Sequence, residues 1–169
     1  MKTLVCAVLL FLAAPAYSQD AKTHVANKTV VANLINSQGE SVGTATLSPA
    51  AAGVKITLDI RNLPPGEHSI HIHENAKCDP PDFKSAGGPF DSENHTHGGH
   101  PAGDIPDFSL IVSANGTAHV STIAPYVTHG TDDHSVFSNG GTAIIIHAVA
   151  GGTGSGAPPR IACGVITKP

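Results

Sequence analysis

Residues 53–66, GVKITLDIRNLPPG, decide the fold class of this chain. Apolar side chains occupy every second position from Val54 to Ile60, and a Pro-Pro-Gly sequence follows. Successive side chains of a β-strand point to opposite faces, so this alternation predicts a strand with one buried face. Six other segments carry β-branched residues between clusters of Gly, Pro, Asn or Ser: KTVVANLIN, SVGTATLSP, EHSIHIHEN, FSLIVSANGTAHVSTIA, GTAIIIHAV and RIACGVIT. No stretch shows a helical apolar stripe over three turns, so the sequence predicts an all-β fold.

Two regions lack strand character. Residues 74–107 form a long segment rich in Pro, Gly, Asp and His, and loops of this length in a compact domain are usually functional or disordered. Residues 151–159, GGTGSGAPP, carry no charge and have the composition of a flexible connector. We find no internal repeat and no second domain, so we expect residues 19–169 to form a single β domain.

The first 18 residues, MKTLVCAVLLFLAAPAYS, combine a lysine, an apolar run and a site of small residues. This order is typical of a secretory signal peptide, and the run is too short to span a membrane. We therefore expect residues 1–18 to be removed and the protein to be periplasmic or extracellular. The whole chain has 9 basic and 13 acidic residues, a balance that does not favour nucleic acid or an anionic membrane as a partner.

Cys78 and Cys163 are the cysteines that follow the signal segment. Thiols of an exported protein usually pair, so a disulfide is the favoured interpretation and two free buried cysteines are the alternative. In the chain-entropy model, closing so long a loop contributes about 4 kcal/mol to stability. The pair would tie the long segment that begins at residue 74 to the last strand.

The chain has eleven histidines, and three of them lie within or at the end of strand-like runs. His71 and His73 would project from one face of their strand, where they could chelate a metal ion. For such an isolated pair, a solvated strand face is the more common explanation. His147 ends the apolar run GTAIIIH, and a lone histidine there is more often structural. Three imidazoles with an open coordination position, however, suit copper, zinc or iron.

A second group of ligand-type residues lies in the segment ENHTHGGHPAGD. It contains His95, His97, His100 and Asp104, separated by spacers with glycine. Histidines with one carboxylate are a typical zinc pattern, and a pH-sensitive surface loop is the alternative.

Arg160 lies three residues before Cys163. If the disulfide holds this strand near the histidine-containing loop, the guanidinium could orient a small anion near the metals through paired hydrogen bonds. Without the disulfide, a surface arginine would be the default interpretation.

Taken together, the motifs HSIHIHENAKC, KSAGGPFDSENHTHGG, HPAGD, AIIIHA and PRIACGVI resemble those of copper/zinc superoxide dismutases of the secreted bacterial type. They occur in the right order and cover nearly all of residues 19–169. The resemblance implies a Greek-key β-sandwich, or flattened eight-stranded barrel, with long metal-binding loops. It also implies conversion of superoxide to dioxygen and hydrogen peroxide by copper that alternates between Cu(II) and Cu(I).

The same resemblance assigns roles to the residues singled out above. It implies that Arg160 orients superoxide, the small anionic substrate, beside the copper, and it is compatible with a homodimer. The implied ligands and cysteine pair are His71, His73 and His147 for copper, His97, His100 and Asp104 for zinc, and Cys78 with Cys163 for a disulfide.

Two features depart from the family pattern. Pro89 stands where the family has a histidine that bridges copper and zinc and is thought to supply a proton when copper is reduced, so metal affinity and the proton step are both affected. His95, an extra histidine two positions before His97, is a hypothetical substitute. The connector between His147 and Arg160 lacks the charged residues that steer superoxide and orient ligands in the family, which predicts a more open copper site.

Three functions are compatible with these residues. The first is an exported superoxide dismutase, because the three copper histidines and Arg160 are retained. The second is a non-catalytic relative that stores or delivers copper or zinc, which Pro89 and the uncharged connector favour. The third is a β-sandwich interaction module with remnant histidines, and the retention of so many ligand-type residues speaks against it.

Overall fold

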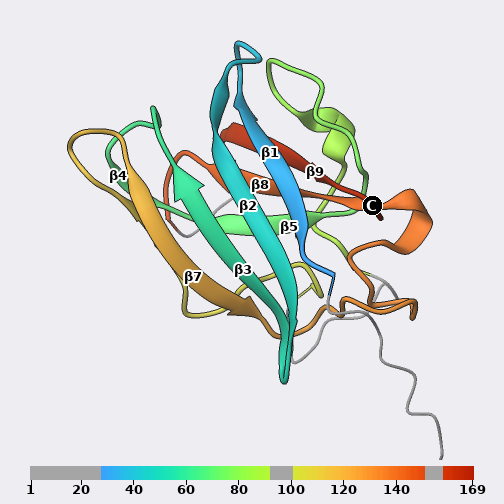
Figure 1. Cartoon of the computed structure of the whole chain (residues 1–169). Helices are drawn as coiled ribbons and strands as arrows, with labels where there is room; N and C mark the ends of the chain where they lie inside the picture. The colour runs from blue at the N-terminus through green and yellow to red at the C-terminus, as the bar shows by residue number, and fades with distance from the viewer. Residues whose placement is uncertain (1–27, 92–100, 151–157) are drawn as a thin grey trace, which may run out of the picture.

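The computed structural model describes residues 28–91, 101–150 and 158–169. Within these ranges the regular structure is almost entirely β, as the sequence predicts, and each of the seven predicted segments contains at least one strand (Figure 1). Two short 3₁₀ turns, Lys84–Ala86 and Ser138–Gly140, are the helical elements of the described residues. The strands are β1 (Val30–Asn36), β2 (Ser41–Ala50), β3 (Gly53–Ile60), β4 (Gly66–His68), β5 (Ile70–His73), β6 (Leu110–Val112), β7 (Ala118–Ala124), β8 (Thr142–His147) and β9 (Arg160–Ile166).

The strands form one curled sheet and one small sheet. Seven strands pair in the order β5-β8-β9-β1-β2-β3-β7, and β4 pairs with β6. Only Ser69 separates β4 from β5, so these two strands are halves of one strand that passes from one sheet to the other. Counted in this way the described chain has eight strands, and the non-sequential pairings β1–β9, β3–β7 and β5–β8 give the expected Greek-key arrangement.

The main core is formed by side chains on the inner faces of these strands. In β3 the four aliphatic side chains from Val54 to Ile60 are buried, whereas Lys55 and Asp59 between them are exposed. β8 lies between β5 and β9 and is buried along its whole length. The alternation from Val54 to Ile60 is therefore the pattern of a strand with one buried face. The continuous apolar run in β8 is that of a strand buried on both faces.

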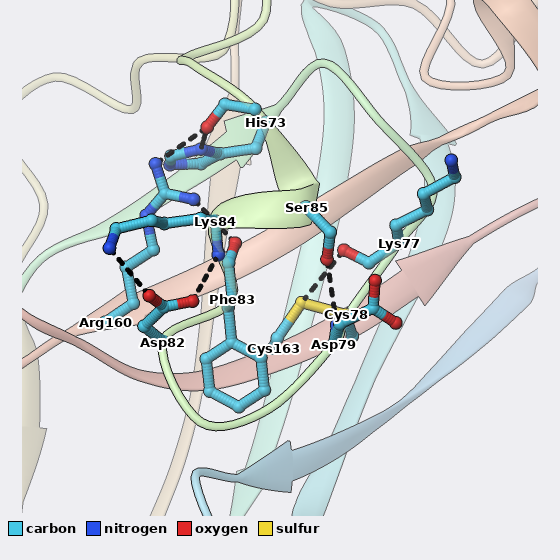
Figure 2. Close-up of a disulfide and its surroundings, with 11 residues drawn as sticks. His73, Lys77, Cys78, Asp79, Asp82, Phe83, Lys84, Ser85, Arg160 and Cys163 are labelled. Carbon is cyan, nitrogen blue, oxygen red and sulfur yellow. Dashed lines mark hydrogen bonds and ion pairs between the residues drawn. A yellow bond between two sulfur atoms is a disulfide. The ribbon is translucent and has the colours of Figure 1, made fainter.

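A second, smaller apolar cluster attaches the loop after β5 to the outer face of β8 and β9. It contains Phe83 and Ala86 from the loop, Ala143 and Ile145 from β8, and Cys163 from β9. The Cys78–Cys163 disulfide lies beside this cluster, and its two Cα atoms are 5.6 Å apart (Figure 2). The predicted disulfide is therefore confirmed. This cluster and the disulfide position the loop that borders the histidines described below.

Some expectations lie outside the described residues. The predicted signal peptide, residues 1–18, is one of them, and residues 151–157 of the connector are another. Among the described residues, no helix has the length and apolar character needed to cross a membrane.

We expect Ile56→Ala to lower the free energy of unfolding by about 2–5 kcal/mol, because Ile56 is fully buried and the substitution leaves a cavity. Ile123→Ala on the neighbouring strand β7 is the matched control, since Ile123 is 38% exposed. Urea unfolding followed by circular dichroism measures both. A loss in Ile56→Ala as small as that in Ile123→Ala would contradict the burial of this face of β3.

Candidate metal centre

Three histidines meet on the outer face of the β5–β8 pair. His71 and His73 alternate with the buried Ile70 and Ile72 along β5, so both imidazoles project from the face opposite the core. β8 runs antiparallel beside β5 and ends at His147, whose amide donates to the carbonyl of Ser69 at 2.9 Å. Strand register therefore brings His147, distant in sequence, to the predicted pair.

The three imidazoles are close enough to share one metal ion. Their ring centroids are 4.9 Å apart for His71 and His147, 5.7 Å for His73 and His147, and 6.5 Å for His71 and His73. One ring nitrogen from each lies within 4.8 Å of the others, and this is the one group of three or more potential ligands found among the described residues.

Backbone hydrogen bonds determine which nitrogen faces the cluster. Nδ1 of His73 lies 3.0 Å from the carbonyl oxygen of Gly87, and Nδ1 of His147 lies 2.9 Å from that of Pro158. A carbonyl oxygen only accepts, so each Nδ1 carries the proton and each Nε2 keeps its lone pair. Both Nε2 atoms are buried without a hydrogen-bond partner in the described part of the chain. Buried polar atoms are rarely left in this state, and a metal ion would satisfy both.

Burial also favours the neutral form that binds metals. Desolvation lowers the pKa of His71, His73 and His147, and it brings the pKa of His73 to about 3. The positive charge of Arg160 adds to the lowering of the pKa of His73 and His147, while the Asp104 carboxylate partly opposes the lowering of the pKa of His71. The donor set is thus uncharged at neutral pH, as copper or zinc coordination requires.

Arg160 lies beside the histidine cluster. It begins β9 opposite His147, and its Nη1 and Nη2 donate to the carbonyls of Phe83 and Gly87 at 2.6 and 2.7 Å. The Gly87 carbonyl therefore accepts hydrogen bonds from both Arg160 and His73, which places the guanidinium next to a candidate ligand (Figure 2). Desolvation lowers the pKa of Arg160, and the Asp82 carboxylate opposes this shift.

Pro89 lies next to the cluster on the loop after β5. Its backbone forms an isolated antiparallel bridge with His73. Residues directly opposite in an antiparallel pair share a face, so the side chain at position 89 lies on the face that carries the candidate ligands. The proline ring is exposed and offers no donor atom. A histidine at this position would be directed toward the same cluster.

Asp104 is the described member of the predicted zinc group. A ring of backbone hydrogen bonds holds the preceding residue, because Ile72 donates to Gly103, Gly103 to Phe90, and Phe90 to Ile72, at 2.9, 2.7 and 2.8 Å. Asp104 is thereby kept near β5, where its charge influences His71. His95, His97 and His100 lie outside the described residues, so the zinc site as a whole stays a prediction.

Sequence reasoning did not assign roles to His68 and Gly87. His68 is buried, with Nδ1 2.9 Å from the carbonyl oxygen of His147 and Nε2 2.9 Å from that of Pro64. The contact with His68 holds the backbone of His147 in place. In the same way, hydrogen bonds to the Gly87 carbonyl orient the side chains of His73 and Arg160. The position of His68 three residues before His71 was a visible signal, and Pro64 is a local partner, four residues away. The contact with the His147 carbonyl, 79 residues away, could not be read from the sequence.

The chain belongs to the copper/zinc superoxide dismutase family, whose model matches residues 41–166. This family places it in the superoxide dismutase class of oxidoreductases, and the family's metals are copper and zinc. Superoxide dismutase [Cu-Zn] 1 of Aquifex aeolicus is 39% identical over 176 residues, covering 95% of each chain. Superoxide dismutase [Cu-Zn] of Escherichia coli K12 is 33% identical and covers 83% of this chain and 88% of its own. The superoxide dismutase-like protein YojM of Bacillus subtilis is 35% identical, with 79% and 73% covered.

Solved structures agree with this assignment. A superoxide dismutase-like protein from Bacillus subtilis superimposes with a TM-score of 0.72 at 32% identity, covering 80% of this chain and 97% of that one. A mutant of that protein in which one proline is replaced by histidine gives a TM-score of 0.73. The monomeric copper, zinc superoxide dismutase from Salmonella enterica gives 0.64 at 28% identity, with 83% and 100% covered.

We expect the metal-free protein to lose stability as the pH falls below 6.5. The pKa of His73 is about 3 in the folded protein and 6.5 by its ordinary value, so the unfolded chain binds more protons between these limits. Within that window, His73 lowers the free energy of unfolding by about 1.4 kcal/mol for each pH unit of acidification. Chemical unfolding at several pH values, compared with His73→Gln, measures the effect. Equal pH slopes in the two proteins would contradict the lowered pKa.

Proposed function

We propose that this chain is an exported superoxide dismutase that holds copper through His71, His73 and His147. The observation that carries the proposal is the pair of buried Nε2 atoms, on His73 and His147, that have no hydrogen-bond partner in the described residues and lie beside His71. Arg160 next to this cluster supplies the positive charge that an anionic substrate needs. Family membership supports the same reaction.

Bound copper would supply the electron exchange, in which one superoxide is oxidised to dioxygen and the next, with two protons, is reduced to hydrogen peroxide. The chain's own residues would hold and orient the reactants. Arg160 has five N–H donors, of which the Phe83 and Gly87 carbonyls account for two, so others can bind superoxide. Pro89 has no proton to transfer, and the protons would come from water or from another group.

A neighbouring zinc site is the second part of the proposal. His97, His100 and Asp104 are its proposed ligands, with His95 as a candidate substitute for the missing bridge. The support is the closeness of Asp104 to β5 and the ligand-type residues in the segment before it. A carboxylate with two or three imidazoles is a typical zinc donor set.

We also assign the protein to the periplasm or the extracellular space, with residues 1–18 as a removed signal peptide and 19–169 as the single functional domain. The amino-terminal pattern supports this, and so does the Cys78–Cys163 disulfide, because such bonds persist in oxidising compartments. Superoxide is the proposed partner.

A non-catalytic protein that stores or delivers copper is the second candidate function. Pro89 favours it, because the position opposite His73 offers neither a ligand nor a proton. The Bacillus subtilis relative is named only as superoxide dismutase-like. In this alternative the three histidines would bind copper, and Arg160 would hold the loop carbonyls without orienting a substrate.

The decisive experiment compares the copper- and zinc-loaded protein with Pro89→His. We expect the parent to consume superoxide faster than it decays in buffer without protein. Pro89→His should raise the parent's rate on the order of 100-fold, because it restores a proton donor and a ligand. Pulse radiolysis measures the rates and elemental analysis the bound metals. Pro125→His, at an exposed proline after β7, is the matched control. A parent that binds copper yet consumes no superoxide would exclude the enzyme and favour the alternative.

A separate measurement addresses His95. If it replaces the missing bridge, His95→Ala should lower zinc or copper occupancy as much as His97→Ala does, because each would remove one donor from the same shell. Both variants are loaded identically and their metals counted by mass spectrometry, with His119→Ala on the exposed face of β7 as the control. Unchanged occupancy in His95→Ala would identify His95 as an ordinary loop residue.

A further inference from the structure

An open groove of about 410 Å³ lies against Arg160. We call it the Arg160 groove, and it is lined by Pro81, Asp82, Lys84, Pro158, Pro159 and Arg160. One wall comes from the disulfide-bound loop and the other from the segment that enters β9. An anion that approaches Arg160 from this side therefore passes Asp82 and Lys84 (Figure 2).

The charges in the groove are few and of opposite sign. Lys84 and Arg160 contribute two positive charges and Asp82 one negative charge, so the lining carries 2 − 1 = +1. The Lys84 ammonium lies 2.8 Å from the Asp82 carboxylate, and the two side chains are 83% and 52% exposed. Ion pairs this exposed are weak, so the ammonium is not held permanently by its partner.

The Asp82 carboxylate acts on both cations. It pairs with Lys84 directly, and its charge also reaches Arg160, where it raises the pKa against the lowering that burial causes. Hydrogen bonds from Lys84 lower the pKa of Asp82 itself, so the carboxylate is ionised at neutral pH. Asp82 thus reduces the positive potential at the place where an anion would bind.

We infer that Asp82 and Lys84 set the anion affinity of the Arg160 groove, with Lys84 attracting superoxide toward Arg160 and Asp82 attenuating that attraction. This inference rests on the proposed function for its substrate. The part of the connector that the structure describes, Ala148 to Ala150 with Pro158 and Pro159, brings no charge to the approach. Among the described residues that line the groove, Lys84 is therefore the one cation besides Arg160.

A purely structural role is the competing explanation. Asp82 Oδ1 accepts a hydrogen bond from the Lys84 amide at 3.1 Å and so supports the first turn of Lys84–Ala86. Asp82→Asn keeps an oxygen acceptor for this amide and removes only the charge. Substitution by asparagine therefore separates the electrostatic role from the structural one.

The test uses the metal-loaded protein at low ionic strength. Asp82→Asn should raise kcat/KM for superoxide about twofold, Lys84→Gln should lower it about twofold, and the double variant, with a lining charge of +1, should match the parent. All differences should shrink at 1 M salt, where the Debye length is about 3 Å. Asp59→Asn and Lys55→Gln make the same charge changes at exposed positions of β3, three strands from β9, and serve as controls.

A second readout does not depend on turnover. Inorganic phosphate is titrated into the metal-free, disulfide-bonded protein while the Nε–H signal of Arg160 is followed by nuclear magnetic resonance. Asp82→Asn should tighten binding and Lys84→Gln should weaken it, each about twofold. If the parent consumes no superoxide, the proposed function fails and this titration alone decides the inference. If the parent is active but neither readout changes beyond the controls, the inference is overturned while the proposed function stands.

Discussion

The hydrogen bonds accepted by the carbonyl oxygen of Gly87 determine how the other groups of the candidate site are oriented. It accepts a hydrogen bond from Nδ1 of His73 and another from Nη2 of Arg160, so one backbone atom sets the orientation of a candidate ligand and of the candidate anion-binding group. Gly87 has a φ of +75°, and a Cβ there would clash with the Glu74 carboxylate. Glu74 in turn accepts a hydrogen bond from the amide of Gly88. The positive φ therefore favours glycine at position 87, while the Glu74 side chain could move away from an added Cβ.

The position of that carbonyl depends on tertiary contacts of the loop. The apolar cluster around Phe83 attaches the loop to β8 and β9, and the Cys78–Cys163 disulfide ties it to β9 covalently. Burial of two histidines lowers the stability of the metal-free protein, because His73 and His147 each keep a buried Nε2 without a hydrogen-bond partner in the described residues. A metal ion would remove this cost, so metal binding and stability are coupled here.

The candidate site keeps the histidines and the arginine that resemble those of the family, but it has a proline opposite His73. Three imidazoles lie close enough to share one metal ion, and Arg160 and the disulfide-bound loop lie beside them. Opposite His73, however, stands Pro89, which removes one donor and one proton carrier while the backbone pairing is kept. The charges of Asp82 and Lys84 lie at the approach to Arg160, beside a connector whose described residues carry none.

The sequence by itself determined the all-β class and the strand segments, because period-two alternation is a local signal. It also favoured the pairing of the two cysteines, through the chemistry of exported thiols. It also placed His71 and His73 on one face, since that follows from strand geometry alone. The family resemblance implied His147 as a third ligand, but only the tertiary structure decided that it meets His71 and His73. The structure also decided that His68 contacts the His147 carbonyl and that Asp82 and Lys84 face Arg160. These relations arise from strand register and loop packing between segments about 75 or more residues apart, and such distant pairings leave no periodic trace in one sequence.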